Sequence, residues 1–305
     1  MSIIHETSNS KYVSHIFKLD TPNTSYVLCV VDEEGFVGHL YYGSKINDCH
    51  LENLIRINEM PFVPSHNNRD RGSFLDSFPM EYSTNGIGDY RESCLSIETE
   101  GGFEAVGLTY LSYDIVEGKN KILGLPATFG KKEDVNSLIL HCIDKATGLN
   151  IDLIYSAFDD VDVITRSVKI INKSSENIYL TKVFSTCLDM DNKDFNVTSL
   201  NGSWARERHK ETVPVGHNRL SIESFRGETS HQDHPFMMLS TPNTTDETGE
   251  VYAMNFVYSG NFKATVMNNQ FDQIRMVMGI HPDNFKWKLL PDESFESPEV
   301  VMLFI

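Results

Sequence analysis

The chain has 305 residues, and 40% of them are apolar, which is enough to fill a sizeable core and far from the composition of a disordered protein. Asp and Glu number 43 against 26 Lys and Arg, so the formal net charge is −17 at pH 7. That balance argues against nucleic acid or an anionic membrane surface as a partner, because both are bound through basic patches.

The amino-terminal segment, residues 1–13, has no basic stretch followed by an apolar one, so no signal peptide is visible. No run of 18 or more apolar residues occurs, which predicts no membrane span. The cysteines are odd in number and scattered, a pattern typical of reduced, mostly buried thiols and not of a disulfide frame or a zinc site. We therefore expect a cytoplasmic protein. The cysteines are Cys29, Cys49, Cys94, Cys142 and Cys187.

Alternation of apolar and polar residues dominates the chain. Residues 25–31 and 36–42 flank a segment that is a turn by composition, Asp32-Glu33-Glu34-Gly35, and together they predict a β-hairpin. Residues 161–171 carry apolar side chains at both parities, which predicts a strand buried on both faces within a sandwich. Further strand candidates are 137–143, 150–156, 178–188, 219–223, 236–240, 250–258 and 273–279.

Two segments differ from this pattern. Residues 44–59 space their apolar side chains Ile46, Leu51, Leu54 and Ile55 as a short helix would. The stretch 61–77 is polar, turn-rich and poor in aliphatic residues, so we interpret it as a long loop. Loops of that length in a compact domain usually carry function.

Many short strands and almost no helix predict an all-β fold, a large antiparallel sandwich. No shift in composition, repeat or low-complexity segment divides the chain, so we expect one domain over residues 1–305. The last residues, 299–305, form a strand-like apolar run that stops without a turn or a polar tail. We interpret this run as a chain interrupted before its natural end.

Nine groups of motifs follow one another along the chain. They are 78–82 (FPMEY) with 88–91 (GDYR), 124–128 (GLPAT), 163–167 (VITRS), 202–208 (GSWARER), 223–227 (ESFRG), 230–236 (SHQDHPF), 249–252 (GEVY), 258–262 (YSGNF) and 297–301 (SPEVV). In this order and spacing they resemble the amino-terminal domain of bacterial glycoside hydrolase family 36 α-galactosidases. One departure is Phe225, which replaces a basic residue between Ser224 and Arg226.

In that family the matching region is a β-supersandwich of the galactose-mutarotase type, and it precedes a (β/α)8 barrel. The barrel holds a nucleophile and an acid/base carboxylate, which retaining chemistry places about 5 to 5.5 Å apart. The family's nucleophile motif, an Asp after a Lys-Trp-like pair, is absent here because Lys286-Trp287 is followed by Lys288. The resemblance therefore implies no catalytic residue in this chain, no metal, no cofactor and no hydrolysis by the chain alone.

The resemblance also implies partners and a site. Such enzymes act on α-galactosides such as melibiose and raffinose, and the domain packs on its own barrel within a homotetramer. A loop after the first strands, here 59–76, reaches into a neighbour's active pocket. Carried over residue by residue, Glu59, Phe62 and Arg71 match the residues that line that pocket. Glu59 stands where family members often have Asp, which is one methylene shorter.

The residue types of this loop suit a galactoside pocket, which needs carboxylates and Arg for the hydroxyls and an apolar face for the ring. Taken without the resemblance, the same residues also fit a simpler interpretation. Arg69, Asp70 and Arg71 would then form a solvated charge cluster, and Phe62 would pack in the core. Both interpretations stay open at this point.

Three other groups have simple structural interpretations. Residues 204–208 (WARER) fit a sugar platform or an internal Arg–Glu network beneath the Trp, and we favour the network. His231 and His234 lack the i, i+4 helical spacing that turns two imidazoles toward one metal, so we expect a turn. Asp89 and Arg91 occupy alternate positions of a predicted strand start and are expected to form a structural pair with Glu81.

Two functions outside the hydrolase interpretation remain. A free-standing enzyme of the sugar mutarotase type would use a His as acid and a Glu as base, but its motifs find no match here. A free carbohydrate-binding module would need aromatic side chains on one sheet face, and only Trp204 and Trp287 are present as tryptophans. We therefore favour the hydrolase domain.

Overall fold

The computed structural model describes residues 2–56 and 75–305. Within these ranges the chain forms 20 strands and two short 3₁₀ turns, η1 (Leu51–Leu54) and η2 (Lys132–Asp134), and no α-helix. None of the helical turns in the described part is long and apolar enough to cross a bilayer. All the strand pairs within the sheets are antiparallel, so the predicted all-β, antiparallel fold is confirmed.

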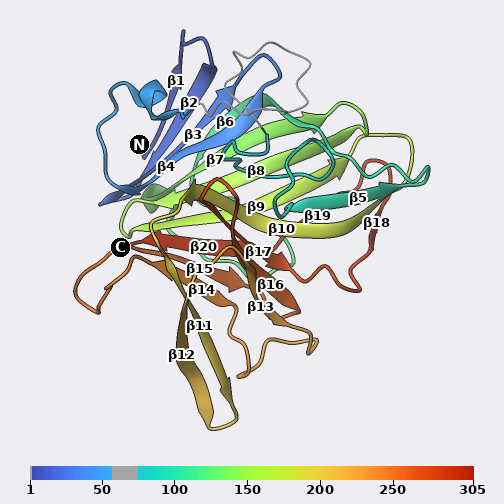
Figure 1. Cartoon of the computed structure of the whole chain (residues 1–305). Coiled ribbons are helices and arrows are strands. Elements are labelled where there is room, and N and C mark those ends of the chain that lie inside the picture. The colour runs from blue at the N-terminus through green and yellow to red at the C-terminus, as the bar shows by residue number, and fades with distance from the viewer. Residues whose placement is uncertain (1, 57–74) are drawn as a thin grey trace.

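The strands form three sheets (Figure 1). The first follows chain order and contains β1 (Ile3–Thr7), β2 (Val13–Asp20), β3 (Thr24–Val31) and β4 (Phe36–Ser44). The second is built around the long strand β10 and contains, in order, β13 (Arg219–Ser224), β16 (Phe262–Asn268), β17 (Gln273–Ile280), β10 (Ile178–Asp191) and β18 (Trp287–Leu289), with β5 (Leu95–Thr99) also paired to β10.

The third and largest sheet places strands far apart in the sequence side by side. Its order is β12 (Arg206–Pro214), β11 (Asn196–Ser203), β14 (Phe236–Ser240), β15 (Val251–Val257), β20 (Glu299–Phe304), β9 (Val163–Asn172), β8 (Leu149–Phe158), β7 (Val135–Asp144) and β6 (Leu108–Glu117), with β19 (Ser294–Glu296) paired to β9.

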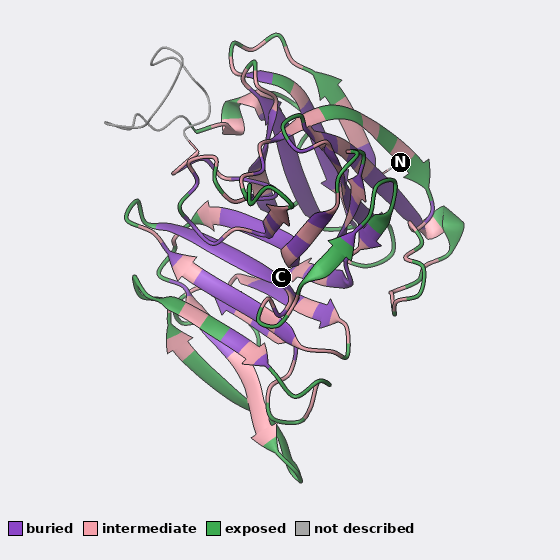
Figure 2. Cartoon of the chain, turned by 90° about the vertical axis from the view of Figure 1, so that its right-hand side faces the viewer, coloured by how far each residue is buried: buried purple, intermediate pink, exposed green. Residues whose placement is uncertain are grey.

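One hydrophobic core joins the three sheets. It takes Phe17 and Leu28 from the first sheet, Leu180 from the second and Leu140 and Ile151 from the third. Figure 2 shows this buried interior running through the middle of the molecule, with the β11–β12 hairpin exposed at one end. Inward-facing apolar side chains of neighbouring sheets fill the space between them, as the alternating patterns require.

Several predicted elements are confirmed. The hairpin over 25–42 is β3 and β4, which pair from Val31↔Phe36 back to Thr24↔Ser44. Its turn uses left-handed backbone at Asp32 and Gly35 (φ 59° and 77°), a conformation that Gly adopts without strain. The strand predicted to be buried on both faces is β9, which lies between β8 and β20.

The predicted helix over 44–59 is wrong within the described residues. Strand β4 continues to Ser44, and only η1 has helical hydrogen bonding, preceded by a left-handed His50 (φ 58°). Leu51 enters a small core cluster, and Ile46 and Leu54 pack against it along an irregular path. These residues pack in the core without a helix, so the spacing of apolar residues did not predict the secondary structure of this segment. Residues 57–59 lie outside the described part.

Candidate functional site

The predicted substrate-lining residues, Glu59, Phe62 and Arg71, all lie within 57–74, outside the described residues. Most of the predicted loop, 61–77, lies there too. The structure does describe both flanks of this segment, which end at Arg56 on one side and resume at Leu75 on the other. The geometry of the candidate site is therefore the geometry of these flanks and of the groups that hold them.

The carboxyl-side flank is held by side chains from other parts of the chain. Arg91 donates from Nη2 to the carbonyl oxygens of Leu75 and Phe78, at 3.0 and 2.6 Å. Gln273, on β17, donates from Nε2 to the carbonyl of Ser77 at 2.8 Å. These bonds satisfy carbonyl groups that no strand pairs, and so they fix the path of the backbone where it re-enters the core.

Arg91 belongs to a cluster of four buried charges, Asp89, Arg91, Asp189 and Arg275, called here the buried quartet. Arg91 Nε lies 2.8 Å from Asp89 Oδ1, and its Nη1 lies 3.2 Å from Asp189 Oδ2. Arg275 Nη2 contacts Asp89 Oδ2 at 2.8 Å and Asp189 Oδ2 at 2.6 Å. Two carboxylates and two guanidinium groups balance in charge, as burial requires.

The quartet keeps its carboxylates ionised. Burial alone would raise the pKa of Asp89, but Arg275 and Arg91 outweigh it and lower that pKa to about 2. The same two arginines hold the pKa of Asp189 below its usual value against the effect of burial. Asp189 also accepts a 2.9 Å bond from the backbone N–H of Met80, so the quartet ties β10 to the flank as well.

A second buried cluster lies next along the same flank, around Glu81. Glu81 Oε1 accepts from Tyr26 and lies 2.8 Å from His39 Nδ1, and Oε2 accepts from Tyr155 at 2.7 Å. Arg166 Nη2 is 3.2 Å from Oε2 and donates to the Glu81 carbonyl at 2.7 Å. Burial would raise the pKa of Glu81, but Arg166 and the bond from His39 lower it. Every oxygen of this carboxylate is occupied, so its role is structural.

A pocket of about 400 Å³ lies between the two flanks. Arg56 and Phe78 come from the flanks, Tyr41 from β4 and Tyr252 from β15, and Asp191 from the end of β10. Arg56 forms an ion pair with Asp191 at this pocket. Aromatic rings beside a carboxylate and a guanidinium group are the chemistry that holds sugar hydroxyls and C–H faces.

Other sequence-predicted groups fall elsewhere. Asp89 and Arg91 do pair, but they precede β5, which begins at Leu95, and Glu81 belongs to the neighbouring cluster instead of joining them. The expected internal Arg–Glu network under Trp204 is wrong. Trp204 is 83% exposed at the tip of the β11–β12 hairpin, and the charged side chains after it are exposed as well.

The segment 231–234 forms an irregular turn against β11, with His234 N bonded to the Leu200 carbonyl at 3.0 Å. Within the described ranges no group of three or more His, Cys, Asp or Glu side chains is arranged to hold a metal ion. Four of the cysteines are buried and Cys49 is exposed, in line with the expected thiols.

Sequence reasoning missed Arg166, Asp189 and Arg275, the charges that build both clusters. Each is itself buried within a largely buried stretch of its strand, β9, β10 or β17. A charge on the inward face of such a strand is the signal of a buried ion pair. The partner of each charge comes from a distant segment, so the pairing itself was not visible.

Comparisons with known proteins place the chain in context. A family model described as the glycosyl hydrolase family 36 N-terminal domain matches residues 35–290. The chain is 36% identical over 291 residues to the bifunctional alpha-galactosidase/sucrose kinase AgaSK of Mediterraneibacter gnavus, covering 95% of this chain and 31% of that protein. It is 36% identical over 289 residues to alpha-galactosidase AgaA of Geobacillus stearothermophilus, covering 94% of this chain and 40% of that protein.

Solved structures agree with these matches. A variant of AgaA from Geobacillus stearothermophilus in complex with raffinose has a TM-score of 0.91 at 35% identity, over 95% of this chain and 40% of that one. An alpha-galactosidase from Lactobacillus brevis has a TM-score of 0.91 at 36% identity, over 95% of this chain and 39% of that one. The chain thus spans about two fifths or less of the length of these relatives.

Proposed function

Because this chain belongs to the family of glycosyl hydrolase family 36 N-terminal domains, we propose that it is the amino-terminal domain of a retaining α-galactosidase acting on terminal α-galactosides of the melibiose and raffinose type. The observation that carries the proposal is the match over residues 35–290, together with relatives that are α-galactosidases and more than twice as long. The paired carboxylates of the reaction then belong to a catalytic barrel on which this domain packs.

In this proposal the domain has two tasks besides covering the barrel. It mediates assembly of identical subunits into a tetramer in the cytoplasm, and its segment 59–76 lines a neighbour's substrate pocket with Glu59, Phe62 and Arg71. Arg91 of the buried quartet and Gln273 support the second task, because they hold the backbone carbonyls at the end of that segment and just after it. A segment held firmly at its base can present side chains to another subunit with little loss of conformational entropy.

The chain alone is expected to be inactive. An assay of the purified 305-residue chain with p-nitrophenyl α-galactoside, beside full-length AgaA as the positive control, tests this directly. No turnover above the buffer rate is the expected result. Turnover by the chain would mean that its own carboxylates perform the reaction and would overturn the proposal.

A test of the proposed pocket-lining residues needs a complete enzyme. We would replace the matched part of AgaA by this chain and measure kcat and KM for raffinose. Arg71→Ala and Phe62→Ala in that hybrid should each lower kcat/KM at least about tenfold, while Arg206→Ala on the exposed hairpin should leave it unchanged. Mixing the Arg71→Ala hybrid with a hybrid lacking the barrel nucleophile should restore part of the activity, since the Arg71→Ala subunit keeps its nucleophile and receives Arg71 from its neighbour. Absence of recovery would contradict lining across subunits.

A further inference from the structure

Two histidines on neighbouring strands lie side by side in the first sheet. β1 is the first strand in the order of that sheet, and its His5 lies diagonally across from His15 of β2. His5 Nε2 and His15 Nδ1 are 3.0 Å apart, so the two imidazoles share one hydrogen bond. Such a bond requires at least one neutral imidazole, because two imidazolium rings have no acceptor nitrogen between them.

Other aromatic side chains hold the two imidazoles in place. The hydroxyl of Tyr113, on β6 of the third sheet, lies 2.9 Å from His5 Nδ1. The His5 ring packs against Phe17 and Tyr113, with 4.7 and 4.4 Å between ring centroids, and the His15 ring packs against Tyr110 at 5.1 Å. Both histidines are half-buried, so solvent still reaches the pair.

The surroundings keep both imidazoles neutral at pH 7. Burial lowers the pKa of His5 below its ordinary value, and the neighbouring His15 lowers it further. Burial also lowers the pKa of His15. Neutral imidazole is the form that ligates a metal ion. The pair therefore needs no loss of protons before it binds a cation at neutral pH.

The separation of the two nitrogens suits a single ion. Two imidazole nitrogens about 2.0–2.1 Å from one ion lie about 2.9 Å apart when they meet at a right angle and about 3.3 Å apart at the tetrahedral angle. The 3.0 Å between His5 Nε2 and His15 Nδ1 is closer to the right angle, which square-planar or tetragonal Cu²⁺ and Ni²⁺ adopt. The imidazoles must turn until both lone pairs face the ion, and their partial exposure permits that movement.

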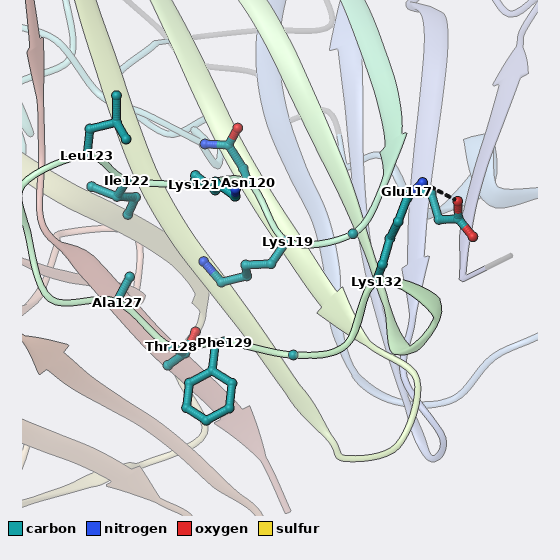
Figure 3. A pocket seen from close by; sticks show the side chains of 12 residues that line it. Glu117, Lys119, Asn120, Lys121, Ile122, Leu123, Ala127, Thr128, Phe129 and Lys132 are labelled. Atoms are coloured by element: carbon teal, nitrogen blue, oxygen red, sulfur yellow. Dashed lines mark ion pairs between the residues drawn. The ribbon is translucent and has the colours of Figure 1, made fainter.

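A larger hollow elsewhere on the chain does not suit a cation. Residues 117–132 border a hollow of about 530 Å³, and Lys119, Lys121 and Lys132 lie around it (Figure 3). Lys132 pairs with Glu117, but the lysines outnumber this carboxylate. The histidine pair, by contrast, adds no positive charge at neutral pH, and the net charge of −17 on the whole chain attracts cations.

We propose that His5 and His15 form a binding site for a divalent transition-metal ion of the Cu²⁺ and Ni²⁺ class, with His5 Nε2 and His15 Nδ1 as its protein ligands. Within residues 2–56 and 75–305 no third His, Cys, Asp or Glu completes a metal-binding group, so water fills the remaining positions. The ion cross-links β1 to β2 and thereby stabilises the first strand of the fold. This site is independent of the proposed function.

The protons of the pair can be placed without a change of charge. In the bound state the proton of His5 is on Nδ1 and that of His15 is on Nε2, so both ligand nitrogens are free to bind the ion. The Tyr113 hydroxyl then accepts from His5 Nδ1 and fixes that tautomer. Tyr113 is therefore a positioning residue that acts through His5.

Isothermal titration calorimetry with NiCl2 at pH 7.5 tests the site on the 305-residue chain. A Cys49→Ser background removes the exposed thiol, which would compete for transition-metal ions. His5→Gln and His15→Gln should each raise the Kd for Ni²⁺ at least about tenfold, and Tyr113→Phe should raise it in the same direction. The control His217→Gln, at an exposed histidine before β13, should leave the Kd unchanged.

A spectroscopic measurement counts the ligands. Electron paramagnetic resonance of the Cu²⁺-loaded Cys49→Ser chain should show coupling to two imidazole nitrogens, and the spectrum of the His15→Gln variant should lose at least one of them. Thermal unfolding without metal checks that each variant is folded.

Three results would overturn the site. The first is a chain that binds no Ni²⁺. The second is a Kd that neither histidine substitution raises, which would place the ion elsewhere. The third is a Kd that only one of the two raises, which would leave a single imidazole in place of a shared site. The assignment to an α-galactosidase is tested separately by the AgaA hybrid.

Discussion

At the scale of single residues, buried arginines decide how the loop flanks are placed. Arg91 binds two carboxylates of the buried quartet and two backbone carbonyls of the flank with one guanidinium group. Its planar set of five donors allows this, and a lysine in its place would not reproduce it. The quartet therefore converts an irregular stretch of backbone into a fixed support.

Breaking the quartet should be costly. Arg275→Met leaves Asp89 and Asp189 buried with only Arg91 to balance them, so we expect the free energy of unfolding to fall by about 3–5 kcal/mol. Urea denaturation at pH 7 measures it. The matched change Lys173→Met, in an exposed pair with Asp292, should cost less than about 1 kcal/mol. Equal losses of unfolding free energy for both variants would show that the quartet stabilises the fold no more than an exposed ion pair does.

The quartet should also make stability depend on acid. The folded pKa of Asp89 is about 2 against an ordinary pKa of 3.8 in the unfolded chain, so its contribution to stability is fully present above pH 4 and is lost as the pH falls toward 2. The difference between the folded and unfolded pKa of Asp89 corresponds to about 2 kcal/mol in the free energy of unfolding. Urea midpoints measured between pH 5 and pH 2 should decline more steeply for the wild type than for Asp89→Asn. Parallel declines for the two proteins would contradict the conclusion that Asp89 makes stability depend on acid.

At the scale of elements, close packing between a strand and a loop explains why one position in the strand is a glycine. Gly38 on β4 faces Met80 across an isolated bridge, and a Cβ added there would overlap the ring of Phe78. The segment 78–80 passes so near to β4 that only a glycine fits. This contact connects the first sheet with the flank of the candidate site.

A methyl group at this position should therefore be harmful. Gly38→Ala must displace the buried Phe78 or the strand, and we expect a loss of about 1–3 kcal/mol in the free energy of unfolding. Gly216→Ala, where an added Cβ meets nothing within 4 Å, should be near neutral. Thermal or urea unfolding of the pair decides the matter, and a neutral Gly38→Ala would show that Phe78 moves freely.

At the scale of the whole molecule, the last strand closes the largest sheet. β20 pairs with β15 on one side and β9 on the other, so segments more than 80 residues apart in the chain meet through it. Such long-range pairing favours slow folding, because many loops close before the contacts form. The β11–β12 hairpin, by contrast, lies at the margin of the same sheet and carries little of the core.

This contrast predicts where the fold tolerates change. Met302→Ala, inside β20 and 1% exposed, should lower the free energy of unfolding by about 2–5 kcal/mol. Trp204→Ala, at the hairpin tip, should change it by no more than about 0.5 kcal/mol despite the larger side chain removed. Chemical denaturation of both variants provides the comparison. A large effect at Trp204 would mean that the hairpin packs on the body of the molecule.

The amino-acid sequence alone determined the all-β class, the first hairpin, the doubly buried strand β9 and the family, because alternation, turn residues and ordered motifs are local signals. It was silent on strands such as β12, whose charged residues hold their place only by pairing with β11. Tertiary structure alone decided that Arg166, Asp189 and Arg275 find distant partners, and that apolar residues near Leu51 pack without a helix. These depend on which segments meet in space, and long-range contacts are not encoded in any one window of the chain.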